Sequence, residues 1–200
     1  MSTPVLEKTA TLAPPSELPN PPVPVRPVGE QGPQYSDTET YSKQILGKSA
    51  FELYKLHVVG TKGNPAKPWH VAPEQSPFII DDDAEKMIVG VYIEFDRSPL
   101  TKLLLCLGTK IVANFHFEGF GGLAAEKDLK VEITSKEGQF RYWIGDVLTP
   151  ADLGLNSGYY QVASTVQIGP VTEKCGQYVF GYGYIGEIRV QIAQQPNTLP

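Results

Sequence analysis

The stretch Met87-Ile88-Val89-Gly90-Val91-Tyr92-Ile93-Glu94-Phe95 decides the fold class. Its odd-numbered positions are all large and apolar, whereas its even-numbered positions include a glycine, a tyrosine and a glutamate. Successive side chains of a β-strand point to opposite faces of a sheet. The alternation therefore predicts a strand with one face in a core and the other face wet.

The same period of two recurs on both sides of this stretch. It is found at 51–59, 110–118, 129–134, 140–144, 160–168 and 178–192. The last of these reads as one long strand or as two strands joined at Gly186. No long helical pattern separates the stretches, so parallel strands with crossover helices are not expected. The sequence predicts an all-β fold, an antiparallel β-sandwich.

Two short helical turns are expected between the strands. Ser98-Pro99 precedes an apolar run that ends at Gly108, which gives an N-cap, a proline at the first helical position and a C-terminal glycine. Thr149-Pro150-Ala151-Asp152 is followed by Gly154, and Asp152 is placed to complete a capping box with Thr149.

The stretch Leu155-Asn156-Ser157-Gly158-Tyr159-Tyr160-Gln161-Val162 follows the second turn and opens a strand. It resembles the E–F corner of immunoglobulin-like domains, in which a tyrosine early in strand F bonds back to the preceding loop. Tyr160 would have that structural role. The resemblance covers about fifteen residues and implies a fold but no activity. An immunoglobulin-like or a jelly-roll-like sandwich is expected, and the sequence leaves both topologies open.

The N-terminal part has a different composition. Nine of the 18 prolines precede Tyr35, whereas nearly all aromatic residues follow Phe51. We expect a proline-rich, extended or disordered arm at 1–45, a β-sandwich domain at 46–195 and a short tail at 196–200. The arm is either a spacer or a docking strap. If it docks, its candidate interaction residues are Pro21, Pro22, Pro24 and Pro27.

The stretch Tyr178-Val179-Phe180-Gly181-Tyr182-Gly183-Tyr184-Ile185-Gly186 alternates aromatic residues with small ones. The interpretation we favour is an inward row of aromatics that fills the core, with Gly181 and Gly183 allowing the strand to curve. In the other interpretation, Tyr182 and Tyr184 face outward and bind sugar rings, a neighbouring subunit or the arm. Trp69 and Trp143 are candidates for the same surface.

Charge and hydropathy disfavour some classes of partner. The net charge of −5 is mild and no basic stripe is present, so nucleic acid is not expected as a partner. No apolar run approaches the roughly 20 residues of a membrane span, and no signal peptide is evident. The expected location is the cytoplasm or the interior of a virion or another macromolecular assembly.

The cysteines are too few for a disulfide scaffold. Cys106 lies among leucines and is predicted to be buried, whereas Cys175 lies in a polar turn and is the more reactive candidate. Whether the two are paired is left open.

Few residues are arranged for catalysis or metal binding. Asp81-Asp82-Asp83 is expected to be a solvated turn rather than a calcium loop. His57, His70 and His116 lack metal-ligand spacing, and His116 would become a ligand only if the fold brought another donor beside it. No nucleophile elbow and no phosphate loop occurs. We therefore expect no catalytic residue, no metal and no cofactor.

Two hypotheses of function follow. The first is a non-enzymatic structural or assembly protein, in which the sandwich and the arm make protein–protein contacts in a homo-oligomer or a larger particle of the capsid, filament or injection-machine type. The second is a carbohydrate-binding or adhesion module that uses exposed tyrosine and tryptophan side chains on the sandwich.

Overall fold

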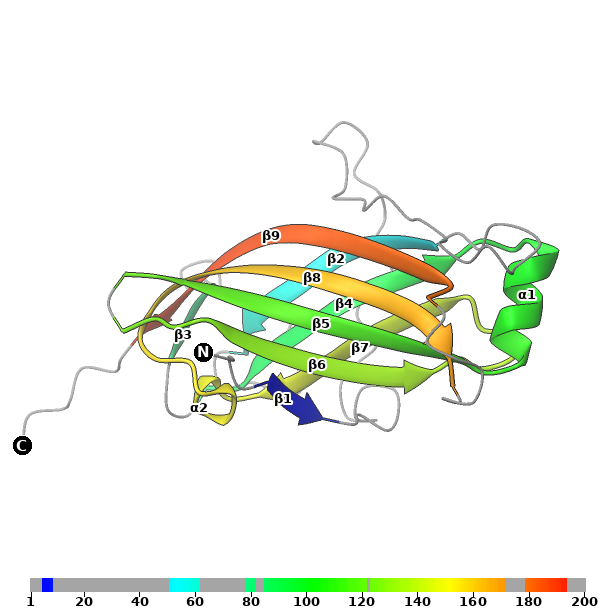
Figure 1. The fold of residues 1–200 in the computed structure, drawn as a ribbon. Helices are drawn as coiled ribbons and strands as arrows, with labels where there is room; N and C mark the ends of the chain where they lie inside the picture. Colours follow the sequence, from blue (N-terminus) through cyan, green and yellow to red (C-terminus); the bar gives the residue numbers. More distant parts are fainter. Residues whose placement is uncertain are drawn as a thin grey trace, which may run out of the picture.

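A computed structural model of the chain describes residues 5–8, 51–61, 78–81, 85–121, 123–171 and 179–193. Two packed sheets form the body (Figure 1). One sheet has the strand order β1 (Val5–Lys8), β6 (Lys127–Thr134), β5 (Thr109–Phe120), β8 (Gly158–Pro170), β9 (Gly181–Ala193) and β3 (Ile79–Asp81). The other has the order β2 (Phe51–Gly60), β4 (Met87–Phe95) and β7 (Arg141–Leu148). The all-β sandwich is confirmed.

The alternation read from the sequence selects the residues of the core. In β4 the side chains of Met87, Val89, Val91, Ile93 and Phe95 belong to one buried cluster. The inward residues of β5 and β8 join them from the opposite sheet, including Phe115, Phe117, Val162 and Val166. Each fully buried side chain of this size contributes roughly 1.5–3 kcal/mol to the free energy of folding. The two sheets are therefore held together mainly by apolar contact between their inner faces.

Two edge strands depart from the antiparallel arrangement that the sequence predicts. β1 pairs in parallel with β6, in a register that places Leu6 beside Leu129. β3 pairs in parallel with β9, and Ile80 lies beside Ile192. Sequence analysis found neither strand, because three or four residues are too few to show a period of two. Ile80 is nevertheless fully buried, so β3 contributes to the core.

Both short helices begin as their cap residues predict. In α1 (Pro99–Cys106) the Ser98 side chain accepts a hydrogen bond from the amide of Thr101. In α2 (Pro150–Leu153) Thr149 and Asp152 form the expected capping box, and Gly154 ends the helix in the left-handed conformation. These turns connect one sheet to the other at opposite ends of the sandwich (Figure 1).

The prediction that Cys106 is buried is wrong. Cys106 is a free, exposed thiol at the last position of α1. Successive side chains of a helix point about 100° apart, so only part of the run of leucines can face the core. Leu105 takes the buried position, and Leu103 and Leu107 are exposed along with Cys106.

The corner before β8 is the one that the sequence predicts. The Tyr160 ring is buried against Phe117, and its hydroxyl donates to the carbonyl oxygen of Asn156 at 2.8 Å. The same hydroxyl accepts from the Asn156 amide at 3.0 Å. Burial raises the pKa of Tyr160, so the hydroxyl keeps the proton that it donates. Tyr160 therefore fixes the angle at which the chain enters β8.

Several predictions fall on residues outside the described ranges. They concern the proline residues of the arm (Pro21, Pro22, Pro24 and Pro27), Trp69, His70, Asp82, Asp83, Cys175 and Tyr178. Asp81 ends β3, and its amide donates to the Glu85 carboxylate at 2.9 Å. The boundaries 1–45, 46–195 and 196–200 stay predictions.

Candidate functional site

The outer face of the six-stranded sheet carries the exposed aromatic residues of β9. Tyr182 and Tyr184 are 41% and 49% exposed, whereas Gly181 and Gly183 are buried. The inward aromatic row that we favoured from the sequence is therefore wrong, and the other interpretation has the right orientation. β9 is one long strand rather than two, with a register shift against β8 beside Val162.

The orientation of β9 follows from the packing of the other sheet. A Cβ atom placed on Gly183 would lie 2.8 Å from Cε2 of Phe51, well inside van der Waals contact. The inner side of β9 thus has no room for larger side chains at this point, because Phe51 and Leu53 of β2 already fill the space. Only a glycine lets the two strands approach so closely, and the tyrosines take the solvent side.

Polar side chains lie beside the two tyrosines. Tyr184 is directly opposite Thr165 of β8, and Tyr182 is directly opposite Gln167. Neighbouring cross-strand side chains on one face lie about 4.5–5.5 Å apart. The outer face therefore combines aromatic rings with hydroxyl and amide groups.

A chain of hydrogen-bonding side chains crosses the same face. His116 of β5 contacts Asp128 of β6 through Nδ1 at 2.8 Å, and its Nε2 lies 3.0 Å from Oγ1 of Thr165. His116 lies on the outer side of β5, as the period of two at 110–118 in the sequence predicts. The fold brings one carboxylate and one hydroxyl beside it, but no group of three or more His, Cys, Asp or Glu residues in the described part of the chain is arranged to hold a metal ion.

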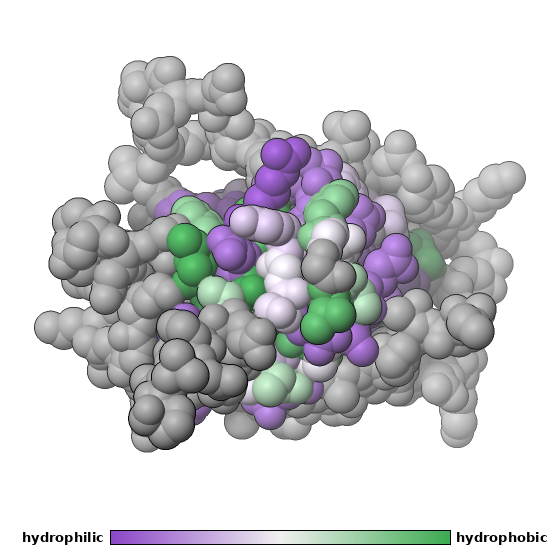
Figure 2. Space-filling model, turned by 90° about the vertical axis from the view of Figure 1, so that its left-hand side faces the viewer, coloured by the Kyte–Doolittle hydropathy of each residue, from purple (hydrophilic) through white to green (hydrophobic). Residues whose placement is uncertain are grey.

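An open cleft lies at one end of this face, where β5 ends and β8 begins. It has a volume of about 520 Å³, within the usual range for ligand sites. Its walls are mainly aromatic, from three side chains that are 44%, 49% and 60% exposed: Phe78, Phe120 and Tyr159. Figure 2 views this end of the molecule and shows hydrophobic residues interleaved with hydrophilic ones.

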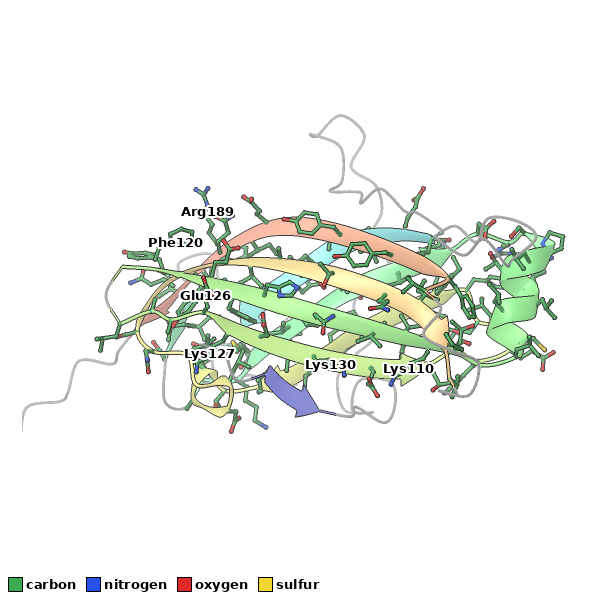
Figure 3. The ribbon with its side chains drawn as sticks, viewed as in Figure 1. Lys110, Phe120, Glu126, Lys127, Lys130 and Arg189 are labelled. Carbon is green, nitrogen blue, oxygen red and sulfur yellow. The ribbon has the colours of Figure 1, made fainter. Side chains whose placement is uncertain are left out.

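Polar groups complete the cleft. Arg189 of β9, Gln161 and Gln191 line it together with the aromatic walls. Phe120 and Arg189 lie at the same end of the sheet (Figure 3). Among the described residues no carboxylate lies within ion-pairing distance of Arg189, whereas Lys110 is 3.0 Å from Glu132 and Arg141 is 2.9 Å from Glu94.

Trp143 does not share the surface of Tyr182 and Tyr184. It lies on β7, on the outer face of the three-stranded sheet, and its ring covers Gly90 of β4. The expectation of a single aromatic surface for the strand and Trp143 is wrong, because β7 and β9 belong to different sheets. Sequence alternation gives the face of a strand but not the sheet to which the strand belongs.

Trp143 lies directly opposite Tyr92, which belongs to a second cluster of aromatic side chains. The rings of Tyr54 and Tyr92 stack with centroids 5.3 Å apart, and the His57 ring meets Tyr92 edge-on at 5.7 Å. Burial, followed by the charge of Lys55, lowers the pKa of His57 to about 4. Burial, followed by Tyr54, raises the pKa of Tyr92 to about 12. These groups are neutral at pH 7, as expected for packed side chains on a half-buried sheet face.

Comparisons with family models, with curated proteins and with solved structures find no match for the chain. No helix in the described ranges is long and apolar enough to cross a membrane. The surface of the molecule itself therefore carries the argument for function.

Sequence analysis missed the cleft. Its lining comes from four separate segments, and none of them holds a recognisable motif. The one signal was the pair Tyr159-Tyr160: in a strand, two adjacent tyrosines face opposite sides, so the residue beside the buried corner tyrosine must face outward.

Proposed function

We propose that the chain is a non-enzymatic structural or assembly protein, whose sandwich and N-terminal arm make protein–protein contacts in a homo-oligomer or a larger particle. The observation that carries this proposal is β1. Val5–Lys8 is far from the rest of the sandwich in the sequence yet pairs with the edge of β6. Roughly 40 residues separate it from β2. The entropy cost of closing a loop grows only slowly with its length, so this long connection makes the pairing of β1 with β6 little costlier than a shorter one would.

An edge strand of this kind is readily exchanged between subunits. If β1 left its place, the N–H and C=O groups along this edge of β6 would accept a complementary strand from another chain. A long connection allows the four residues to come from the same chain or from a neighbour, which is the arrangement of a domain-swapped oligomer. The arm would then join subunits through main-chain hydrogen bonds without any change in the sandwich.

Exposed apolar residues at both ends of the sandwich support self-association. Leu103 of α1 and Leu107, which caps the C-terminus of that helix, are exposed at one end. Leu123 is exposed in the connection between β5 and β6, which lies at the opposite end (Figure 1). Contact with another copy would remove these leucine side chains from water, which favours association.

The strand order supports an immunoglobulin-like topology for the sandwich. The sheet β2-β4-β7 corresponds to strands A, B and E of that fold, and β5-β8-β9 corresponds to C, F and G. Tyr160 then lies at the start of strand F, after the E–F connection that contains α2. This likeness concerns the scaffold alone and brings no activity with it.

The solution mass of the full chain tests the assembly proposal. We expect the full chain to be oligomeric in light scattering, and a chain that starts at Tyr41 to be monomeric with an unchanged circular dichroism spectrum. In the full chain, Leu6→Pro together with Glu7→Pro removes two amide donors from β1 and is expected to weaken the oligomer. Ser16→Pro, in the arm but outside β1, is the matched control. A full chain that stays monomeric at high concentration, and that no partner binds, contradicts the proposal.

The outward tyrosines favour a second candidate function, a carbohydrate-binding or adhesion module. Tyr182 and Tyr184 lie two residues apart on one strand, roughly 7 Å, with Gln167 and Thr165 as neighbouring hydrogen-bonding groups. Aromatic faces stack on sugar rings, and amides and hydroxyls bind sugar hydroxyls. Binding to a glycan array that is lost in Tyr182→Ala and Tyr184→Ala, with the thermal midpoint unchanged, would support this function. An array without any binding would exclude it.

A further inference from the structure

The cleft between β5, β8 and β9 has the chemistry of a site for an extended, proline-rich peptide. Such peptides adopt the polyproline II conformation and dock in grooves lined by aromatic side chains. Three exposed rings, Phe78, Phe120 and Tyr159, supply that lining here. The conformation has no internal hydrogen bonds, so its carbonyl oxygens are free to accept from Gln161, Arg189 and other polar groups of the cleft.

We propose that this cleft binds residues 19–27 of the same chain, hereafter the proline segment. Its sequence is Pro-Asn-Pro-Pro-Val-Pro-Val-Arg-Pro. The inference deepens the proposed role of the arm, because it names the surface of the sandwich that holds the arm in place. Each proline fixes one backbone angle in advance, so the segment loses less conformational entropy on docking than an ordinary peptide.

Charge fixes the direction of the docked segment. Glu17 lies two residues before the proline segment. Arg189 lines the cleft and has no carboxylate partner among the described residues. A guanidinium–carboxylate pair at the rim of the cleft would place the N-terminal end of the segment beside β9. Its prolines would then lie against the rings of Phe120 and Tyr159.

The length of the chain allows the segment to reach the cleft from β1. Lys8 pairs with Val131, which pairs with Ala113 of β5. From Lys8 to Phe120 is roughly 23 Å along the strands and about 10 Å across two strand spacings, or roughly 25 Å in a straight line. The chain from Lys8 to Pro19 spans up to roughly 36 Å when extended. The segment therefore reaches the cleft of its own molecule.

The chain that connects the proline segment to β2 is also long enough for the segment to reach the cleft. Phe51, the first residue of β2, packs against Gly183 near the start of β9. Gln191 of the cleft lies further along that strand, roughly 26 Å away. The connection from Pro27 to Phe51 has about 24 residues, and a flexible chain of that length has an end-to-end distance of roughly 27 Å. No second molecule is needed to bring the proline segment to the cleft.

Cleavage by the glutamate-specific protease Glu-C tests the proposal on the full chain. Glu17 and Glu30 flank the proline segment. We expect cleavage after Glu17 to be at least tenfold faster in the double variant Phe120→Ser, Tyr159→Ser than in the wild type. The matched control, Tyr182→Ser with Tyr184→Ser, removes two exposed rings of the same sheet face outside the cleft and should be cleaved like the wild type. Equal rates in all three proteins would overturn the proposal.

A designed disulfide identifies the source of the segment. The two native cysteines are first removed by Cys106→Ser and Cys175→Ser. In that background, the double variant Val23→Cys, Gln161→Cys should form a disulfide between positions 23 and 161 of one chain. Val23→Cys with Gln167→Cys, on β8 but outside the cleft, should form little or none. A covalent dimer would assign the cleft to the arm of a neighbour and overturn the assignment to the same chain. Absence of the bond in the folded protein would overturn the docking itself.

These readouts are independent of the assembly proposal. Protease protection is measured at a concentration at which light scattering gives the mass of a monomer. If the chain never self-associates but the proline segment is protected, the assembly proposal fails and the docking proposal stands. If the chain self-associates and Glu17 is cleaved at the same rate in every variant, the docking proposal fails alone.

Discussion

The corner at Tyr160 allows a sharp test of the link between sequence and fold. Tyr160→Phe removes one hydroxyl and leaves the buried ring against Phe117 in place. Two hydrogen bonds are lost, one to the carbonyl and one to the amide of Asn156. At a net 0.5–1.5 kcal/mol each, the expected loss of stability is roughly 1–3 kcal/mol. For a domain of about 150 residues, a 2 kcal/mol loss lowers the thermal midpoint by roughly 4–8 °C.

The measurement is urea unfolding of the full chain. The midpoint should fall while the slope stays constant, because the surface exposed on unfolding does not change. Tyr159→Phe is the matched control: it is the same substitution at the next residue, where the side chain is 60% exposed. It should change stability by less than about 0.5 kcal/mol. A Tyr160→Phe variant as stable as the wild type, or an equal loss in both variants, would refute the structural role of the corner.

Three further predictions concern the remainder of the sandwich. Between pH 6.5 and about 4, the unfolded chain protonates His57 and the folded chain does not. Acidification to pH 4.5 should therefore lower the free energy of unfolding, measured in urea, by roughly 2–3 kcal/mol. The His57→Gln variant should lose this part of the pH dependence. Gly90→Ala should lose about 1–3 kcal/mol against the Trp143 ring, with Trp143→Phe relieving part of the loss in a double-mutant cycle. Cys106 should react with a maleimide in the folded chain, as read by peptide mass mapping.

Local sequence was enough to predict most of the strands and both helix starts. The alternation in Met87–Phe95 matches β4 at both ends. The cap residues Ser98 and Thr149 make the hydrogen bonds that their positions predict. These features depend on contacts between residues a few positions apart, and the chain carries that information wherever it folds.

Features that depend on the partner of a strand could not be predicted. The alternation of β9 is the same whether Tyr184 or Gly183 faces inward, and only the side chains of Phe51 and Leu53, packed from β2, decide between them. The exposure of Cys106 likewise depends on which side of α1 meets the sheet. In both cases the energy that decides the orientation comes from residues far away in the sequence.

By itself, the sequence determined the class of fold, the position of the corner at Tyr160 and the contrast between a proline-rich arm and an aromatic body. Tertiary structure alone decided which aromatics face solvent, the pairing of β1 with β6, and the cleft that joins Phe78, Phe120 and Arg189. The division has a physical reason. Backbone period and capping are short-range properties, whereas a surface site forms only when distant strands are brought side by side and their inner faces have filled the core.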